Sequence, residues 1–231
     1  MRGRTDHDEN PRPGWKGVWT LILECTHTMP DATSELTRSG TPRCHVLLPC
    51  AGSGTRAGTG LPKQYQPIAG QPMVLHTLAA LRSVTRIDSC LVVIAPEDSF
   101  WASQPVGTTL ARCGGATRAE SVFNCLQALR DQGTAASDWV LVHDAARCLV
   151  TPAQVDALIA ACWADPVGGL LALPLPDTLK AEAAGRVVVT VERAGKWLAQ
   201  TPQMFRVGAL HAALASTAAS GFAGVTDEAS A

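Results

Sequence analysis

Two kinds of hydrophobic pattern alternate along the chain from residue 44 onward. Short apolar runs, which are typical of strands buried on both faces, occupy residues 44–49, 90–95, 138–143 and 168–174. Between them, apolar residues recur at helical spacing over residues 72–82, 117–130 and 151–163. This alternation predicts an α/β fold with a mostly parallel sheet that is covered by helices on both faces.

Two of the helical segments carry start signals. Thr117 is followed three residues later by Glu120, which is the spelling of a capping box. Thr151 is followed by Pro152, a residue whose fixed φ suits the first helical position. Both signals place a helix start directly after an N-capping threonine.

Two stretches depart from this pattern of strands and helices. Residues 1–41 mix prolines, charges and tryptophans without sustained periodicity, and they predict a disordered or non-native leader before a domain at 42–231. Residues 175–200 contain a β-branched stretch, and they predict a hairpin arm that protrudes from this domain.

Charge and composition exclude several broad classes. The formal net charge of the 231 residues is −1, so no bulk attraction for nucleic acid or an anionic membrane exists. No apolar run approaches the roughly 20 residues of a membrane helix. The 8 cysteines include no CxxC pair, a usage typical of reduced thiols in a cytoplasmic protein.

The stretch "LLPCAGSGTRAGTGLPKQY" at 47–65 carries the first candidate chemistry. From Gly52 it matches the loose dinucleotide pattern G-x-G-x-x-A, but no acidic residue for a ribose occurs from 59 to 87. A Walker A loop is also excluded, because threonine rather than lysine follows Gly58. A plain tight turn after a strand remains as an alternative.

Two cations flank this glycine loop. Backbone N–H groups in such a loop cradle phosphate oxygens, while Arg56 offers a planar fork and Lys63 a point charge. Two cations over a polyphosphate stabilise the charge that develops during phosphoryl or nucleotidyl transfer. The loop therefore predicts transfer chemistry on a bound polyphosphate.

The same loop resembles the signature of the sugar-nucleotide pyrophosphorylase superfamily, and its "LPKQY" ending is similar to the 2-C-methyl-D-erythritol 4-phosphate cytidylyltransferase family. Further motifs of that family follow in order, so the resemblance spans residues 44–231. They are "GGATRAESV" at 114–122, "VLVHDAAR" at 140–147, "LPDTLK" at 175–180, "VERAGKW" at 191–197, "TPQMF" at 201–205 and "TDEASA" at 226–231. The resemblance implies a Rossmann-like three-layer nucleotidyltransferase domain over residues 42–231.

The resemblance also implies roles for residues on the nucleotide side. The expected CTP-binding residues are Ala51, Gly52, Gly54, Gly114, Arg118 and Ser121. The expected catalytic residues are Arg56, Lys63 and Arg193. Ordinary capping at the start of the 117–130 helix is the alternative for Arg118 and Ser121, although a helix N-terminus also attracts anions.

On the acceptor side, Asp144 ends the strand at 138–143. A carboxylate at the carboxyl end of such a strand suits Mg²⁺, and we expect Asp144 and Asp227 as ligands of Mg²⁺ or another divalent cation. A turn aspartate and an ion pair between Asp144 and Arg147 are the alternatives. The resemblance implies that methylerythritol phosphate contacts Asp144, Arg147, Thr178 and Arg193.

The reaction implied by the resemblance is cytidylyl transfer from CTP to methylerythritol phosphate, in a homodimer joined through the arm. The chain stops at "TDEASA", where the family continues with more helix and strand and a substrate-binding lysine, so we expect a missing C-terminal end. An inactive CTP-binding remnant and a cytidylyltransferase for ribitol 5-phosphate are therefore kept as alternatives. A dehydrogenase fits least, because the ribose-binding acid is missing.

Overall fold

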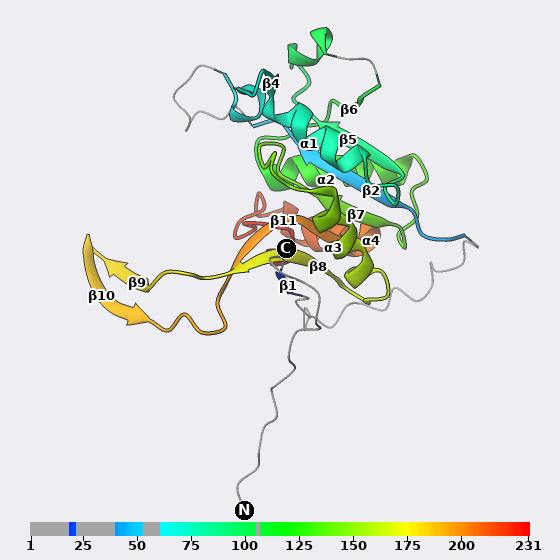
Figure 1. Cartoon of the computed structure of the whole chain (residues 1–231). Helices are drawn as coiled ribbons and strands as arrows, with labels where there is room; N and C mark the ends of the chain where they lie inside the picture. The colour runs from blue at the N-terminus through cyan, green and yellow to red at the C-terminus, as the bar shows by residue number, and fades with distance from the viewer. Residues whose placement is uncertain (1–18, 22–39, 53–60, 105–106) are drawn as a thin grey trace, which may run out of the picture.

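The computed structural model describes residues 19–21, 40–52, 61–104 and 107–231. In this described part, the centre is a seven-stranded sheet of order β1-β8-β11-β7-β2-β5-β6 (Figure 1). Its strands are β1 (Trp19–Leu21), β2 (Cys44–Pro49), β5 (Ser89–Val93), β6 (Thr109–Ala111), β7 (Trp139–Val142), β8 (Gly168–Pro174) and β11 (Trp197–Arg206).

The strand directions confirm a mostly parallel sheet. β2 is parallel to β5 and β7, and β5 is parallel to β6. β11 is antiparallel to both β7 and β8, so β8 runs in the direction of β7. Five of the seven strands (β2, β5, β6, β7 and β8) therefore point one way, and β1 and β11 point the other way.

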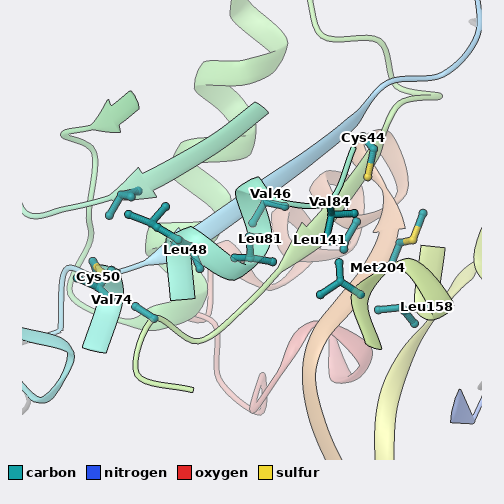
Figure 2. Packing of buried hydrophobic residues seen from close by; sticks show 14 of the residues in the cluster. Cys44, Val46, Leu48, Cys50, Val74, Leu81, Val84, Leu141, Leu158 and Met204 are labelled. Atoms are coloured by element: carbon teal, nitrogen blue, oxygen red, sulfur yellow. The ribbon is translucent and has the colours of Figure 1, made fainter. Parts of the chain in front are cut away.

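Helices pack on both faces of the sheet. α1 (Met73–Arg82) and α3 (Pro152–Cys162) bury apolar residues in one core cluster, while α2 (Arg118–Asp131) and α4 (Val207–Ala218) bury theirs in a second. Within β2, Val46 faces the first cluster and its neighbour Leu47 the second. Figure 2 shows Val46 and Leu48 of β2 packed beside Leu81 of α1. The three-layer expectation is thus confirmed.

The hydrophobic pattern did not predict the short strands β1 and β6, nor the longer elements β11 and α4. β11 is interrupted by polar residues, and its register against β8 shifts between Ala199 and Gln203. α4 is rich in alanine, which gives a weak apolar stripe. β11 matters most for the site, because it inserts between β7 and β8 and brings the "TPQMF" motif beside the loop that follows β7.

The predicted arm is present. β9 (Leu179–Ala183) and β10 (Arg186–Val191) form an antiparallel hairpin that stands away from the body (Figure 1). Its valines are open to solvent: the exposed fractions are 66% for Val187, 60% for Val188 and 54% for Val189.

The remaining elements are short. The 3₁₀ helices are η2 (Lys63–Tyr65), η3 (Phe100–Ser103) and η4 (Glu228–Ser230), and β3 (Pro67–Ile68) pairs with β4 (Gln71–Pro72). Within the predicted leader, β1 pairs with β8 and forms one edge of the sheet, and residues 1–18 and 22–39 lie outside the described part. Among the described helices, none is long and apolar enough to cross a membrane.

Candidate active site

Three loops that follow β2, β6 and β7 contain most of the predicted site residues. Ala51 and Gly52 follow β2, Gly114 follows β6, and Asp144 follows β7. These strands are parallel, so their carboxyl ends meet at one edge of the sheet, where ligands of open α/β sheets bind. Gly54 and Arg56 belong to residues 53–60, which lie outside the described part.

The first two loops are in direct contact. A Cβ added to Gly114 would lie 2.3 Å from the Cβ of Ala51 and 2.9 Å from the carbonyl oxygen of Ile94. The N–H of Gly114 donates to that same carbonyl at 2.9 Å. Only glycine allows this approach, so the predicted CTP-binding residues Ala51 and Gly114 form one continuous backbone surface.

The start of α2 supports the second loop. The Thr117 side chain caps the helix by accepting from the N–H of Glu120 at 3.1 Å. The Glu120 carboxylate accepts from the N–H of Ala116 at 2.6 Å instead of closing the predicted capping box on Thr117. The buried Ser121 hydroxyl accepts from the N–H of Gly115 at 3.0 Å and donates to the carbonyl of Thr117 at 2.9 Å. Ser121 therefore fixes the loop backbone at Gly115 to the first turn of α2.

Arg118 joins this helix start to the loop after β7. Its Nε donates to Oδ1 of Asp144 at 2.9 Å, and Nη1 and Nη2 donate to the two carboxylate oxygens of Glu228 at 2.5 and 3.1 Å. The Nε of Arg147 donates to the other oxygen of Asp144 at 2.9 Å, so the ion pair weighed as an alternative is present. Arg147 also donates to the side-chain oxygen of Gln200 on β11.

This network shifts the pKa values of Asp144, Arg118 and Glu228. Burial disfavours the ionised form of Asp144, but the guanidinium groups of Arg118 and Arg147 outweigh it and lower the pKa of Asp144. Burial lowers the pKa of Arg118, but the carboxylates of Glu228 and Asp144 outweigh it and raise that pKa. Burial of Glu228 prevails over Arg118 and raises the pKa of Glu228. Asp144 is thus an anion held between two cations at neutral pH.

A buried histidine supports the same loop. The Nε2 of His143 lies 3.2 Å from the carbonyl oxygen of Arg147, and its Nδ1 lies 3.0 Å from the hydroxyl of Thr201. That hydroxyl accepts from the N–H of Asp144 at 3.1 Å. Because a carbonyl only accepts, this geometry assigns the proton to Nε2 and leaves Nδ1 to accept from Thr201. Burial lowers the pKa of His143 to about 4, so the ring is neutral.

A cavity of about 620 Å³ opens beside this network. Its polar lining includes Lys63, Arg147, Gln200 and Thr201, and part of its apolar lining is Ile68, Met73, Leu149, Leu171 and Leu173. The cavity therefore brings two of the predicted cations, from η2 and from the loop after β7, to one volume of suitable size for a small phosphorylated molecule.

The predicted arm residues lie elsewhere. Thr178 and Arg193 are exposed at the base of the β9–β10 hairpin, where the guanidinium of Arg193 donates to the carbonyl of Pro176. Neither is among the described residues that line the cavity. The body of a single chain thus brings together the described residues predicted for the nucleotide and part of those predicted for the acceptor, while Thr178 and Arg193 lie apart from them.

The carboxylates predicted to bind a metal already have protein partners. Within the described residues, no group of three or more His, Cys, Asp or Glu side chains is placed to hold a metal ion. Asp144 carries a guanidinium on each oxygen, and Asp227 accepts from the Nε2 of Gln203 at 2.9 Å. Mg²⁺ usually binds through one or two carboxylates plus substrate phosphates and waters. Asp144 therefore offers a carboxylate of the kind that Mg²⁺ uses, but only if an arginine leaves one of its oxygens.

Several residues of this site were not singled out in the sequence. Glu228, Gln200, Thr201 and His143 all lie within or beside the quoted motifs, yet their spacing gave no sign that they converge. Their partners are 110, 53 and 58 residues away in the chain for Glu228, Gln200 and Thr201, respectively. The motif order was the only available signal.

Comparison with known proteins decides the family. The model of IspD, 2-C-methyl-D-erythritol 4-phosphate cytidylyltransferase, matches residues 44–231. The chain belongs to this family. The resemblance inferred from the motifs is confirmed, and the matched range begins at the first residue of β2.

Individual members of the IspD family are similar over most of this chain. A bifunctional enzyme IspD/IspF of Albidiferax ferrireducens is 60% identical over 88% of this chain, which spans about half (49%) of that protein. The 2-C-methyl-D-erythritol 4-phosphate cytidylyltransferase of Laribacter hongkongensis is 54% identical, with 74% of this chain and 76% of that protein covered.

Solved structures agree with the family. A crystal structure of 4-diphosphocytidyl-2C-methyl-D-erythritol synthase has a TM-score of 0.70 at 38% identity and covers 81% of this chain and 83% of that one. IspD of Francisella tularensis has a TM-score of 0.67 at 31% identity, with 80% and 83% covered. Both likenesses confirm the fold class.

Proposed function

We propose that this chain transfers the cytidylyl group of CTP to 2-C-methyl-D-erythritol 4-phosphate. The products are 4-diphosphocytidyl-2-C-methyl-D-erythritol and pyrophosphate, in the non-mevalonate route to isoprenoid precursors. Membership in the IspD family supports this reaction. The structural observation that carries it is the Arg118–Asp144–Arg147 network, which joins the predicted nucleotide loops to the cavity that contains Lys63.

The chemistry requires placement more than acid–base work. A phosphate monoester is already an anion, so its oxygen attacks the α-phosphorus of CTP in line without a general base, and pyrophosphate leaves. Cations that line the cavity hold the two anions close together and stabilise the charge that builds on the phosphoryl oxygens. Lys63 and Arg147 both line the cavity, which supports this role for them. Arg56 lies outside the described part, and its catalytic role stays a prediction.

Mg²⁺ is part of the proposal as the ion that accompanies CTP. Bound Mg²⁺ supplies charge neutralisation at the phosphate oxygens. Asp144 is the residue that would hold this ion, and Arg118, which donates to Asp144 and Glu228, would contact the phosphates.

A homodimer through the arm is also proposed. Thr178 and Arg193 are exposed at the arm base, and three consecutive valines of β10 are more than half exposed. Apolar side chains on a protruding hairpin favour contact with another protein surface. The arm would deliver Thr178 and Arg193 to the acceptor pocket of a second copy. A cytoplasmic location is part of this proposal, supported by the free thiols of the described cysteines.

The test is pyrophosphate release from CTP and Mg²⁺ with methylerythritol 4-phosphate, with ribitol 5-phosphate or with no acceptor. Release that depends on methylerythritol 4-phosphate supports the proposal. Release only with ribitol 5-phosphate would assign a different polyol acceptor. A protein that binds CTP but releases no pyrophosphate would be a binding remnant, and the proposed transfer would be wrong.

A further inference from the structure

The three consecutive side chains of η2 lead to three different places. Lys63 lines the cavity, while Gln64 and Tyr65 are buried. Gln64 reaches the stem of the glycine loop, and Tyr65 enters an aromatic cluster under η3. A single short turn thus contacts the predicted nucleotide loop and the acceptor cavity at the same time.

Gln64 binds the glycine loop through its side-chain amide. Nε2 donates to the carbonyl oxygen of Cys50 at 2.8 Å and to that of Gly52 at 3.0 Å. These two carbonyls flank Ala51, and the N–H of Cys50 donates in turn to Val93 of β5 at 2.7 Å. Gln64 is only 8% exposed. Both of its N–H donors are therefore used on a loop stem that is itself attached to the sheet.

Tyr65 holds the other side of the turn. Its hydroxyl donates to the carboxylate of Asp98 at 2.6 Å and accepts from the indole N–H of Trp101 at 3.0 Å. Its ring stacks on Phe100 with centroids 3.8 Å apart and an interplanar angle of 9°. These contacts leave the backbone of η2 little freedom to shift relative to the sheet.

We propose that Gln64 is a positioning residue, which fixes the separation between the glycine-loop backbone and the Lys63 ammonium. The inference rests on the proposed transfer reaction, since Lys63 is taken to act on the reacting phosphates. It predicts an effect on the transfer step, because a displacement of about 1 Å costs on the order of 10²-fold in rate. CTP binding also uses Gly114 and Arg118, so it should depend less on Gln64.

The decisive variant is Gln64→Glu. It keeps the size of the side chain but places carboxylate oxygens against two carbonyl oxygens, which repels the loop stem. We expect kcat to fall about 10²-fold at neutral pH while KM for CTP changes by less than about threefold. A protonated glutamic acid donates one hydrogen bond, so the ratio of variant to wild-type kcat should rise from about pH 8 to about pH 6. A merely structural role would not produce this recovery.

Gln71→Glu provides the matched control. Gln71 is exposed on β4, in the hairpin that follows η2, and the substitution makes the same change of charge. We expect kcat to remain within about twofold of the wild type, as for most surface substitutions. A similar loss in both variants would assign the effect to charge alone and overturn the positioning role.

Hydrogen exchange separates this inference from the proposed reaction. In the wild type, Mg²⁺ and CTP should slow amide exchange over residues 61–66, and Gln64→Glu should lose this response while it still binds CTP. If the wild type releases no pyrophosphate, the proposed function fails and the exchange comparison alone decides the role of Gln64. If Gln64→Glu does not fold, Gln64→Met leaves the same two carbonyls without their donor and should show the same losses without recovery at low pH. Wild-type kcat together with the wild-type exchange response in either variant would overturn the inference.

Discussion

The loops at the edge of the body and the hairpin arm hold their predicted functional residues in opposite ways. In the body, Arg118 is bound by two carboxylates and Asp144 by two guanidinium groups, in a setting where Ser121 and His143 are almost fully buried. In the arm, Thr178 and Arg193 are exposed, and the valines of β10 face solvent.

This difference indicates which predicted site residues are positioned within one chain and which need a second surface. The predicted nucleotide-binding residues Arg118 and Ser121 are fixed by contacts within one chain, so their geometry does not depend on a bound ligand. The arm pair lies outside the cavity lining of its own chain. Contact with another protein surface would cover the exposed valines of β10 and would give Arg193 a place in a binding site.

Lys63→Ala removes a cation from the cavity of the body and should have the largest effect. Loss of the ammonium in the cavity should lower the rate of transfer about 10³-fold, or about 4 kcal/mol in the transition state. The melting temperature should not change, since Lys63 is exposed. Pyrophosphate release and a thermal melt measure both quantities. Retained turnover would remove Lys63 from the mechanism.

The buried histidine should make the body sensitive to acid. The pKa of His143 is lowered by burial from 6.5 to about 4, so the unfolded chain accepts a proton that the folded chain resists. The free energy of unfolding should be highest above about pH 6.5. It should fall by about 3 kcal/mol as the pH drops toward 4, because the unfolded chain is then protonated at His143 while the folded chain is not.

Denaturant unfolding across this pH range measures the effect. His143→Gln removes the titration and should flatten this part of the pH dependence of the free energy of unfolding. An identical pH dependence in both proteins would show that His143 is not the titrating group.

Arg193→Ala tests whether the arm contributes to binding of the acceptor. Loss of a charge-assisted contact to the acceptor phosphate should lower kcat/KM for methylerythritol 4-phosphate about 30-fold, or about 2 kcal/mol. Co-expression with Lys63→Ala then tests the subunit exchange. In mixed dimers one site combines an intact Lys63 with the intact arm of the other chain, so activity should recover to about a quarter of the wild type. No recovery would place each arm at its own site.

Val188→Ser should give the smallest effect on the folded chain. Val188 is 60% exposed on β10, so the free energy of unfolding of the body should change by less than about 0.5 kcal/mol. The same substitution should weaken self-association, which sedimentation measures. A large loss of stability without a change in association would show that the arm packs on its own body.

The site could be predicted from sequence only as far as its motifs reach. Lys63, Arg118 and Asp144 were each chosen from a local pattern or the family resemblance, and the structure links Arg118 to Asp144 and places Lys63 in the adjacent cavity. Glu228 and Thr201 were missed because their roles arise from contacts to residues far away in the chain. The Ser121 hydroxyl was expected on the nucleotide, while in the structure it supports the loop at Gly115.

By itself, the sequence determined the alternation of strands and helices, the glycine loop with its cations, the arm and the family. These features are local, because periodicity, capping and turn chemistry depend on neighbours within a few residues. The tertiary structure alone decided that β11 inserts between β7 and β8, that Gly114 touches Ala51, and that Arg118 lies between Asp144 and Glu228. Such contacts depend on which strands are neighbours in the sheet. The order of strands in the sheet differs from their order in the sequence, so local patterns do not predict these contacts.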